Sequence, residues 1–169
     1  MLMLKREIVF TRWCEFFYAA LMCGIFLCPK EINMQLEIIQ TSSETMSLAY
    51  NIARVVYAET FGCSLRVVEA LTTMISNYAR KNNCAIRDVI SDATIFESLN
   101  QNSERHAALD VDVNKREFQM CVRIAVRMLH AQISDMCFGA TRFHRVDLLP
   151  DWAIARGYIA DIDGILFYA

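Results

Sequence analysis

Ala53-Arg54-Val55-Val56-Tyr57-Ala58-Glu59-Thr60-Phe61-Gly62 is the stretch that indicates how this chain folds. Apolar residues recur within and before it at three- and four-residue steps: Leu48, Ile52, Val55 and Val56. This spacing predicts an amphipathic helix that begins near residue 47. We expect the helix to end at Gly62, because glycine accepts the left-handed backbone conformation that follows a last turn. Glu59 then lies in the final turn of an apolar helix.

Two more long helices are predicted downstream. One spans about residues 64–81, with Ser64 as its N-cap, and the other spans about residues 115–133. Asn114 followed by Glu117 resembles a capping box at the start of the second. We expect these two helices to bury their apolar stripes against each other. A short helix at residues 85–90 and a polar loop over residues 97–112, with at most one helical turn, connect them.

After Gly139 the apolar residues no longer recur at helical spacing but at every second position. Residues 141–146 alternate as a strand does, and residues 165–168 form a second strand candidate after the turn signal Asp163-Gly164. Helices first and strands last predict an α+β domain that is mainly helical and carries a small C-terminal β element.

Composition excludes several classes of protein. Of the 169 residues, 55% are hydrophobic and 21% are charged, which excludes intrinsic disorder. The formal net charge is only -2, so a nucleic-acid binder that works by neutralising phosphates is not expected. No apolar run reaches the ~20 residues of a membrane-spanning helix, which excludes a polytopic membrane protein.

The cysteine pattern suggests neither a zinc ribbon nor a thioredoxin-like site. The chain has seven cysteines without a C-x-x-C pair: Cys14, Cys23, Cys28, Cys63, Cys84, Cys121 and Cys137. We interpret most of them as small buried hydrophobic residues, with disulfides as the alternative.

The first 46 residues resemble a signal or anchor segment followed by a linker. Lys5, Arg6 and Arg12 precede a charge-free run from Phe16 to Cys28, as in a secretory signal, although no small-residue cleavage site follows. We therefore expect an exported protein of the periplasm or cell envelope, with possible membrane association through residues 13–28. An amphipathic or buried first helix is the alternative. The working domain is placed at residues 47–169.

Glu59 is the strongest candidate for chemistry on the residues alone. At the end of an apolar helix its carboxyl would be partly desolvated, which raises the pKa of a carboxyl toward that of a general acid. The negative end of the helix dipole acts in the same direction. The alternative is an ordinary solvated glutamate in a last helical turn.

Five further motifs, in order along the chain, make residues 48–168 resemble the SleB-type cell wall hydrolases, which include spore-cortex-lytic enzymes. The stretch Ala53 to Gly62 is similar to the family's A-R-x-x-Y-A-E-A-x-G opening. The other matching elements are Asn77, Ile95-Phe96-Glu97, Gly139-Ala140-Thr141-Arg142-Phe143-His144, Pro150-Asp151-Trp152 and Gly164-Ile165-Leu166-Phe167-Tyr168.

The resemblance implies a lysozyme-like or lytic-transglycosylase-like fold and cleavage of the β-1,4 bond between N-acetylmuramic acid and N-acetylglucosamine. Glu59 matches the family's catalytic glutamate. It would protonate the leaving oxygen and then accept the proton of the muramic acid C6 hydroxyl, which attacks C1. A single carboxylate suffices because the nucleophile belongs to the substrate. The resemblance implies peptidoglycan glycan strands as the partner, no cofactor or metal ion, and we expect a monomer.

Five residues are candidates for substrate binding: Asn77, Phe96, His144, Trp152 and Tyr168. His144 could hydrogen-bond a sugar or be a satisfied structural histidine. The aromatic residues could stack on sugar rings or pack in the core.

Departures from the family pattern leave a second reading open. Cys63 stands where the family has a second acidic residue, Tyr78 and Arg142 replace an arginine and a histidine, and the closing motif lacks a histidine. The chain is therefore either an active, divergent member or a degenerate module that binds glycan or supports the envelope without catalysis. A helical partner-binding protein would be favoured if Glu59 lay on a solvated face.

Overall fold

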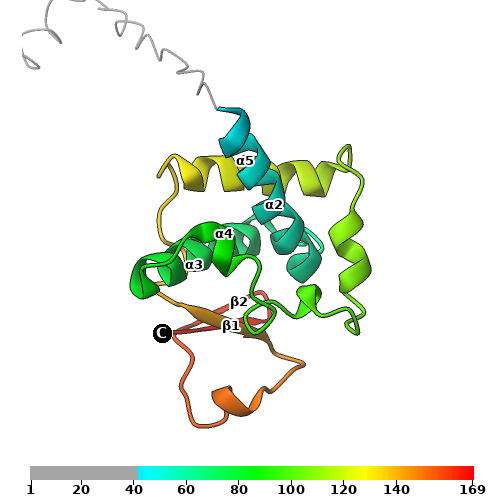
Figure 1. Cartoon of the computed structure of the whole chain (residues 1–169). Helices are drawn as coiled ribbons and strands as arrows, with labels where there is room; N and C mark the ends of the chain where they lie inside the picture. The colour runs from blue at the N-terminus through cyan, green and yellow to red at the C-terminus, as the bar shows by residue number, and fades with distance from the viewer. Residues whose placement is uncertain (1–41) are drawn as a thin grey trace, which may run out of the picture. The chain divides into compact units, whose positions relative to one another are not determined.

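The computed structural model describes residues 42–169, which belong to one compact unit. It has three long helices and a small antiparallel sheet, so the chain is an α+β protein (Figure 1). The expected export signal, the membrane association through residues 13–28 and most of the linker before residue 47 fall outside the described residues. Within residues 42–169, no helix is both long and apolar enough to cross a membrane.

Helix α2 (Ser43–Thr60) is the centre of the helical part. It begins four residues before the expected start because Ser42 caps it, with the Ser42 hydroxyl accepting from the Thr45 N–H at 3.2 Å. Its first turns are partly exposed, whereas nearly every residue from Ile52 onward is buried. A helix buried on all sides at its carboxyl end must place any polar side chain there inside the protein.

The end of α2 is a tight turn that depends on Gly62. Phe61 and Gly62 both have a left-handed backbone, with φ of 52° and 65°. A Cβ atom added to Gly62 would lie 2.7 Å from the Cβ of Glu117, in the first turn of helix α5 (Arg116–Leu129). Gly62 therefore serves two purposes, since it turns the chain and lets α5 approach the end of α2.

Helix α3 (Leu65–Asn82) follows the sequence prediction closely. Ser64 is its N-cap, accepting from the Val67 N–H at 3.2 Å, and Asn83 ends it with a φ of 50°. The predicted stripe is buried from Val68 to Ile75, while Leu65 at its start is 48% exposed.

Helix α5 departs from the prediction at both ends. Its N-cap is Lys115, and the expected capping box does not form because Asn114 is held in a turn by Asp112, whose Oδ1 accepts from the Asn114 N–H at 2.9 Å. The helix ends at Leu129, four residues early. It packs mainly on α2 and to a lesser extent on α3, so the expected pairing of α3 with α5 is correct only in part.

The sheet has three strands in the order β1-β3-β2, all antiparallel. Strands β1 (Arg142–Arg145) and β3 (Ile165–Tyr168) match the two predicted strands, and β3 follows the Asp163-Gly164 turn. Strand β2 (Ala160–Ile162) was not predicted, because three residues are too few to show an alternating pattern.

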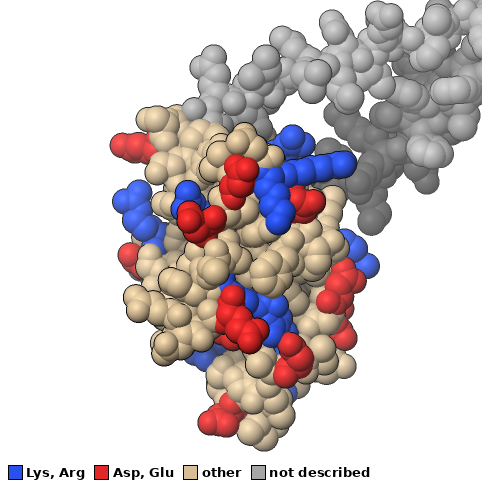
Figure 2. Space-filling model, turned by 90° about the vertical axis from the view of Figure 1, so that its right-hand side faces the viewer, with Lys and Arg blue, Asp and Glu red and all other residues tan. Residues whose placement is uncertain are grey.

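Short helical segments connect these elements. They are α4 (Ile86–Val89), η1 (Glu97–Leu99), η2 (His106–Asp110) and η3 (Asp151–Ala153). The predicted polar loop at residues 97–112 thus contains two 3-10 turns, η1 and η2. Figure 2 shows acidic and basic side chains interspersed over one face of the molecule, in line with the nearly balanced charge.

The close approach at Gly62 leads to a stability prediction. We expect Gly62→Ala to lower the free energy of unfolding by about 2–4 kcal/mol, since it combines an unfavourable backbone conformation with a clash. Gly139→Ala is the control, because Gly139 also has a positive φ of 80° but has open space around the added Cβ. Urea unfolding of both variants measures the difference, and equal losses would contradict the role given to the contact with Glu117.

Candidate active site

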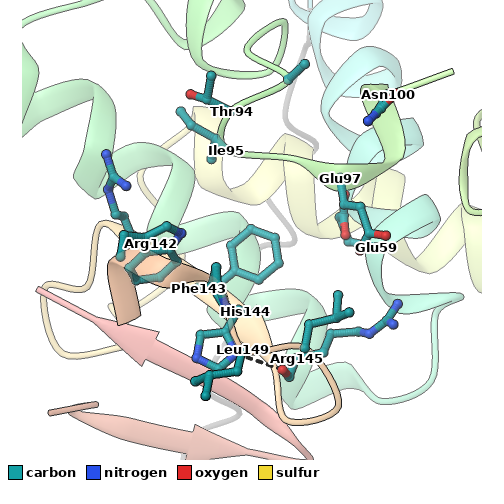
Figure 3. A pocket seen from close by; sticks show the side chains of 14 residues that line it. Glu59, Thr94, Ile95, Glu97, Asn100, Arg142, Phe143, His144, Arg145 and Leu149 are labelled. Carbon is teal, nitrogen blue, oxygen red and sulfur yellow. Dashed lines mark hydrogen bonds between the residues drawn. The ribbon is translucent and has the colours of Figure 1, made fainter. Parts of the chain in front are cut away.

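A cleft of about 390 Å³ lies beside the last turn of α2 (Figure 3). Its walls come from the end of α2, the segment before and around η1, strand β1 and the segment before η3. The residues that line it are Glu59, Ala93, Thr94, Ile95, Glu97, Asn100, Arg142, Phe143, His144, Arg145, Leu148, Leu149, Pro150 and Trp152. Segments separated by some ninety residues of sequence therefore meet around one carboxyl group.

Glu59 is the buried acid of this cleft. Its side chain is only 3% exposed, and its Oε1 atom accepts a hydrogen bond from the Ser98 backbone N–H at 2.8 Å. Burial raises the pKa of Glu59 above the usual carboxyl range, and the charge of Glu97 adds to this effect. The hydrogen bonding of Ser98 and the charge of Arg145 oppose it. A raised pKa extends the pH range in which the carboxyl holds the proton that a general acid must donate.

Arg105 fixes the last turn of α2 from outside the helix. Its guanidinium donates to the carbonyl of Ala58 at 3.1 Å and to the carbonyl of Glu59, and it lies over the ring of Phe61. A cation at a helix carboxyl end is favourable because it pairs with carbonyls that have no partner within the helix. The sequence analysis did not identify Arg105, since it lies 46 residues after Glu59 and no local pattern connects the two.

Glu97 is a second carboxylate of the cleft, and it lies next to Glu59 in Figure 3. Cys63 stands where the SleB-type pattern has its second acidic residue, but Cys63 is exposed and does not line the cleft. Arg145 lies on the opposite wall, where it pairs with Asp147 at 2.8 Å. Glu97 belongs to the Ile95-Phe96-Glu97 element that resembles a family motif. This resemblance is the sequence feature that could have identified Glu97 as a residue of the site.

His144 lines the cleft, but both of its ring nitrogens are engaged within the protein. Nδ1 donates to the Arg145 carbonyl at 2.7 Å, and Nε2 accepts from the Tyr168 hydroxyl at 2.8 Å. Tyr168 stacks on the His144 ring with centroids 5.2 Å apart and is itself buried. His144 thus presents its ring to the cleft, with no nitrogen available for a sugar in this arrangement, and Tyr168 supports it from behind.

Trp152 completes the aromatic group and lines the cleft. Its ring meets those of His144 and Tyr168 edge to face, and the guanidinium of Arg142 lies 5.4 Å from its centroid. The cluster forms a rigid wall because each aromatic ring is held by at least two neighbours.

The other two predicted binding residues do not line the cleft. Phe96 is fully buried and packs against Phe143, with ring centroids 5.8 Å apart, so it supports the wall from the core. Asn77 is buried elsewhere and donates to Asp135 at 3.1 Å and to the Cys137 sulfur at 3.4 Å. It holds the turn that leads into β1. Of the predicted site residues, the structure brings Glu59, His144 and Trp152 together at the cleft, while Asn77, Phe96 and Tyr168 act behind it or away from it.

The described cysteines are all free thiols. Burial raises the pKa of Cys121 and of Cys137 to about 12, so these two behave as small hydrophobic residues. Within residues 42–169, no three acidic, histidine or cysteine side chains gather into a group that could hold a metal ion. The acidic, basic and aromatic side chains around Glu59 are the groups that this cleft offers to a ligand.

Comparison of the chain with protein families, with curated proteins and with solved structures found no match. The chemistry of the cleft is therefore inferred from its geometry and from the motifs in the sequence.

The raised pKa of Glu59 leads to a prediction about stability and pH. Between the pKa of the unfolded state and the higher pKa of the folded state, the folded protein binds more protons, so its stability falls as pH rises. Glu59→Gln removes this loss. We expect the variant to match the wild type near pH 4 and to become more stable toward neutral pH, by about 1.4 kcal/mol for each pH unit that separates the two pKa values.

Urea unfolding at several pH values measures this difference. Glu104→Gln, at an exposed position, is the control for removing one carboxylate. A Glu59→Gln stability difference that does not change with pH would show that folding does not raise the pKa of this carboxyl.

Proposed function

We propose that this chain is a peptidoglycan-degrading cell wall hydrolase that acts as a lytic transglycosylase on a lysozyme-like fold. The observation that carries the proposal is the buried carboxyl of Glu59 at the edge of an open cleft, at the position where the motifs resemble the catalytic glutamate of SleB-type enzymes. The substrate is the glycan strand of peptidoglycan, and the bond cleaved is the β-1,4 link between N-acetylmuramic acid and N-acetylglucosamine.

Glu59 acts first as an acid and then as a base. Protonated Glu59 gives its proton to the glycosidic oxygen, so that the bond from the muramic acid C1 to that oxygen breaks and N-acetylglucosamine leaves with a free hydroxyl. The muramic acid C6 hydroxyl attacks C1, and its proton passes to the Glu59 carboxylate. The products are a 1,6-anhydro sugar and a shortened strand, and Glu59 returns to its protonated state.

Glu97 and Arg145, which both line the cleft, shift the pKa of Glu59 in opposite directions. The negative charge of Glu97 raises the pKa of Glu59 and would stabilise positive charge that develops on the sugar ring, while Arg145 lowers that pKa. Glu97 thereby supplies the second carboxylate that position 63 lacks. Trp152 offers an aromatic face for a sugar ring.

The proposed activity requires a protein outside the cytoplasmic membrane. The signal-like residues 1–28 support export to the periplasm or cell envelope, and we propose that the protein works there as a monomer on glycan strands.

One observation favours a non-catalytic glycan-binding module as a second candidate. Both ring nitrogens of His144 are already satisfied, and the closing motif lacks a histidine, so fewer polar groups reach the substrate than the motifs implied. A partner-binding protein without a glycan role is less favoured, because Glu59 is buried at a cleft and does not lie on a solvated face.

Digestion of purified sacculi separates the two candidates. We expect the wild type to release muropeptides with 1,6-anhydro ends, and Glu59→Gln to lower the rate by about 10²–10⁴-fold, since an amide cannot donate the proton. Glu104→Gln should keep full activity. Binding to sacculi without any product would favour the non-catalytic module, and full activity in Glu59→Gln would exclude the proposed mechanism.

The two charges across the cleft predict opposite changes in the pH profile. The rate should fall at high pH as Glu59 loses its proton, because only the protonated form is the acid. Glu97→Gln removes a like charge and should move this fall to lower pH, while Arg145→Met removes an opposite charge and should move it to higher pH. Profiles of kcat/KM measured between pH 4 and 9 test the pair, and shifts in the same direction would exclude the assignment of Glu59 as the titrating group.

A further inference from the structure

Ser98 is held against Glu59 by its backbone. Its N–H donates to Glu59 Oε1 at 2.8 Å, and its carbonyl accepts from His106 Nδ1 at 2.9 Å. Because a carbonyl can only accept, His106 carries its hydrogen on Nδ1. The residue is thus fixed from both sides, by α2 through its amide and by η2 through its carbonyl.

The hydroxyl of Ser98 has no such partner. It is fully buried, with 0% of the residue exposed, and no protein group in residues 42–169 forms a hydrogen bond with it. A buried hydroxyl without a partner destabilises the folded state. Such groups are rare in native proteins, and a catalytic role is one physical reason for keeping them.

The groups around Glu59 indicate which state that is. Glu97 from η1 and Arg145 from β1 act on the carboxyl through their charges, and Arg105 holds the carbonyl of Glu59. The Ser98 side chain lies near enough to Glu59 to lower the pKa of that carboxyl, as its backbone N–H does, although in this arrangement the hydroxyl does not have hydrogen-bond geometry with Glu59. Rotation about the Cα–Cβ bond moves the Ser98 hydroxyl oxygen, so the hydroxyl can come within donating distance of a carboxylate oxygen once that oxygen has lost its proton.

We propose that the Ser98 hydroxyl is the hydrogen-bond donor that Glu59 gains when its carboxyl ionises. The inference rests on the proposed function, in which Glu59 is ionised between giving its proton to the leaving oxygen and taking one from the C6 hydroxyl. Ser98 is a positioning residue, since it acts through Glu59 and does not itself line the cleft. It stabilises the short-lived carboxylate in a site that otherwise disfavours charge.

Titration of Glu59 in Ser98→Ala tests this role directly. With carboxyl carbons labelled by ¹³C, nuclear magnetic resonance follows Glu59 in the wild type and in the variant. We expect a higher pKa of Glu59 in Ser98→Ala, because the charged form has lost a donor while the backbone N–H remains. The melting temperature should be unchanged or raised, since the hydroxyl has no partner when Glu59 is protonated. Turnover on sacculi should fall about tenfold, which corresponds to about 1.4 kcal/mol.

Matched variants separate this role from a structural one. Ser91→Ala removes an exposed hydroxyl that bonds to the Arg87 carbonyl, and it should change neither the titration nor the turnover. Ser98→Thr keeps a hydroxyl and should restore the wild-type titration; if the added methyl prevents folding, the Ser98→Ala titration decides alone.

An unchanged Glu59 titration in Ser98→Ala would overturn the proposal, as would a shifted titration with unchanged turnover in an active protein. If the wild-type protein cleaves no glycan, the proposed function is wrong. The titration in the same samples would still decide whether the Ser98 hydroxyl serves the ionised carboxyl.

Discussion

The hydrogen bond from the Ser98 N–H to Glu59 joins the central helix to the wall of the cleft. Without a donor at this point, a carboxyl at the buried end of α2 would have no polar partner, which is costly in the protein interior. Arg105 adds the second connection, because it satisfies the carbonyls of the same helical turn. The two connections place the segment 97–105 around the end of α2, and the cleft exists because that segment stays in place.

Stability and chemistry make opposite demands on Glu59. An apolar side chain at this position would stabilise the core around α2 more than Glu59 does. Burial disfavours the charged form of the Glu59 carboxyl. The unpartnered hydroxyl of Ser98 is a second unfavourable feature in the same place. Two such features side by side are typical of a site kept for function, since a site selected for stability alone would have removed them.

The helices could be predicted from the sequence because their signals are local. Apolar spacing and the N-cap Ser64 indicated the bounds of α3 to within one residue. The start of α5 was predicted wrongly because a local hydrogen bond competes with the expected capping box. Asp112 accepts from the Asn114 N–H, so Asn114 does not cap the helix. Strand β2 was missed because it forms only through pairing with β3, which no pattern within three residues can reveal.

The candidate site could be predicted only where a motif marked it. Glu59 was identified by its place at the end of an apolar run, and His144 and Trp152 by their motifs. Which residues face the cleft depends on tertiary packing, so the sequence left open whether Phe96 and Tyr168 stack on a sugar or pack in the core. The structure buries both of them behind the cleft. Ser98, Arg105 and Arg145 carry no sequence signal at all, because their roles arise from contacts across 39 to 86 residues of chain.

The wide sequence separation of these contacts also bears on the order in which the molecule folds. Each long helix can form from residues that are neighbours in the sequence, whereas the contact between Glu59 and Ser98 requires a loop of 39 residues to close. A chain in which α2 has formed but the segment 97–105 has not docked on it would expose Glu59 to water as an ordinary carboxyl group. Glu59 therefore gains its raised pKa only when that segment covers the end of α2, so the acid is a property of the native state and not of the helix alone.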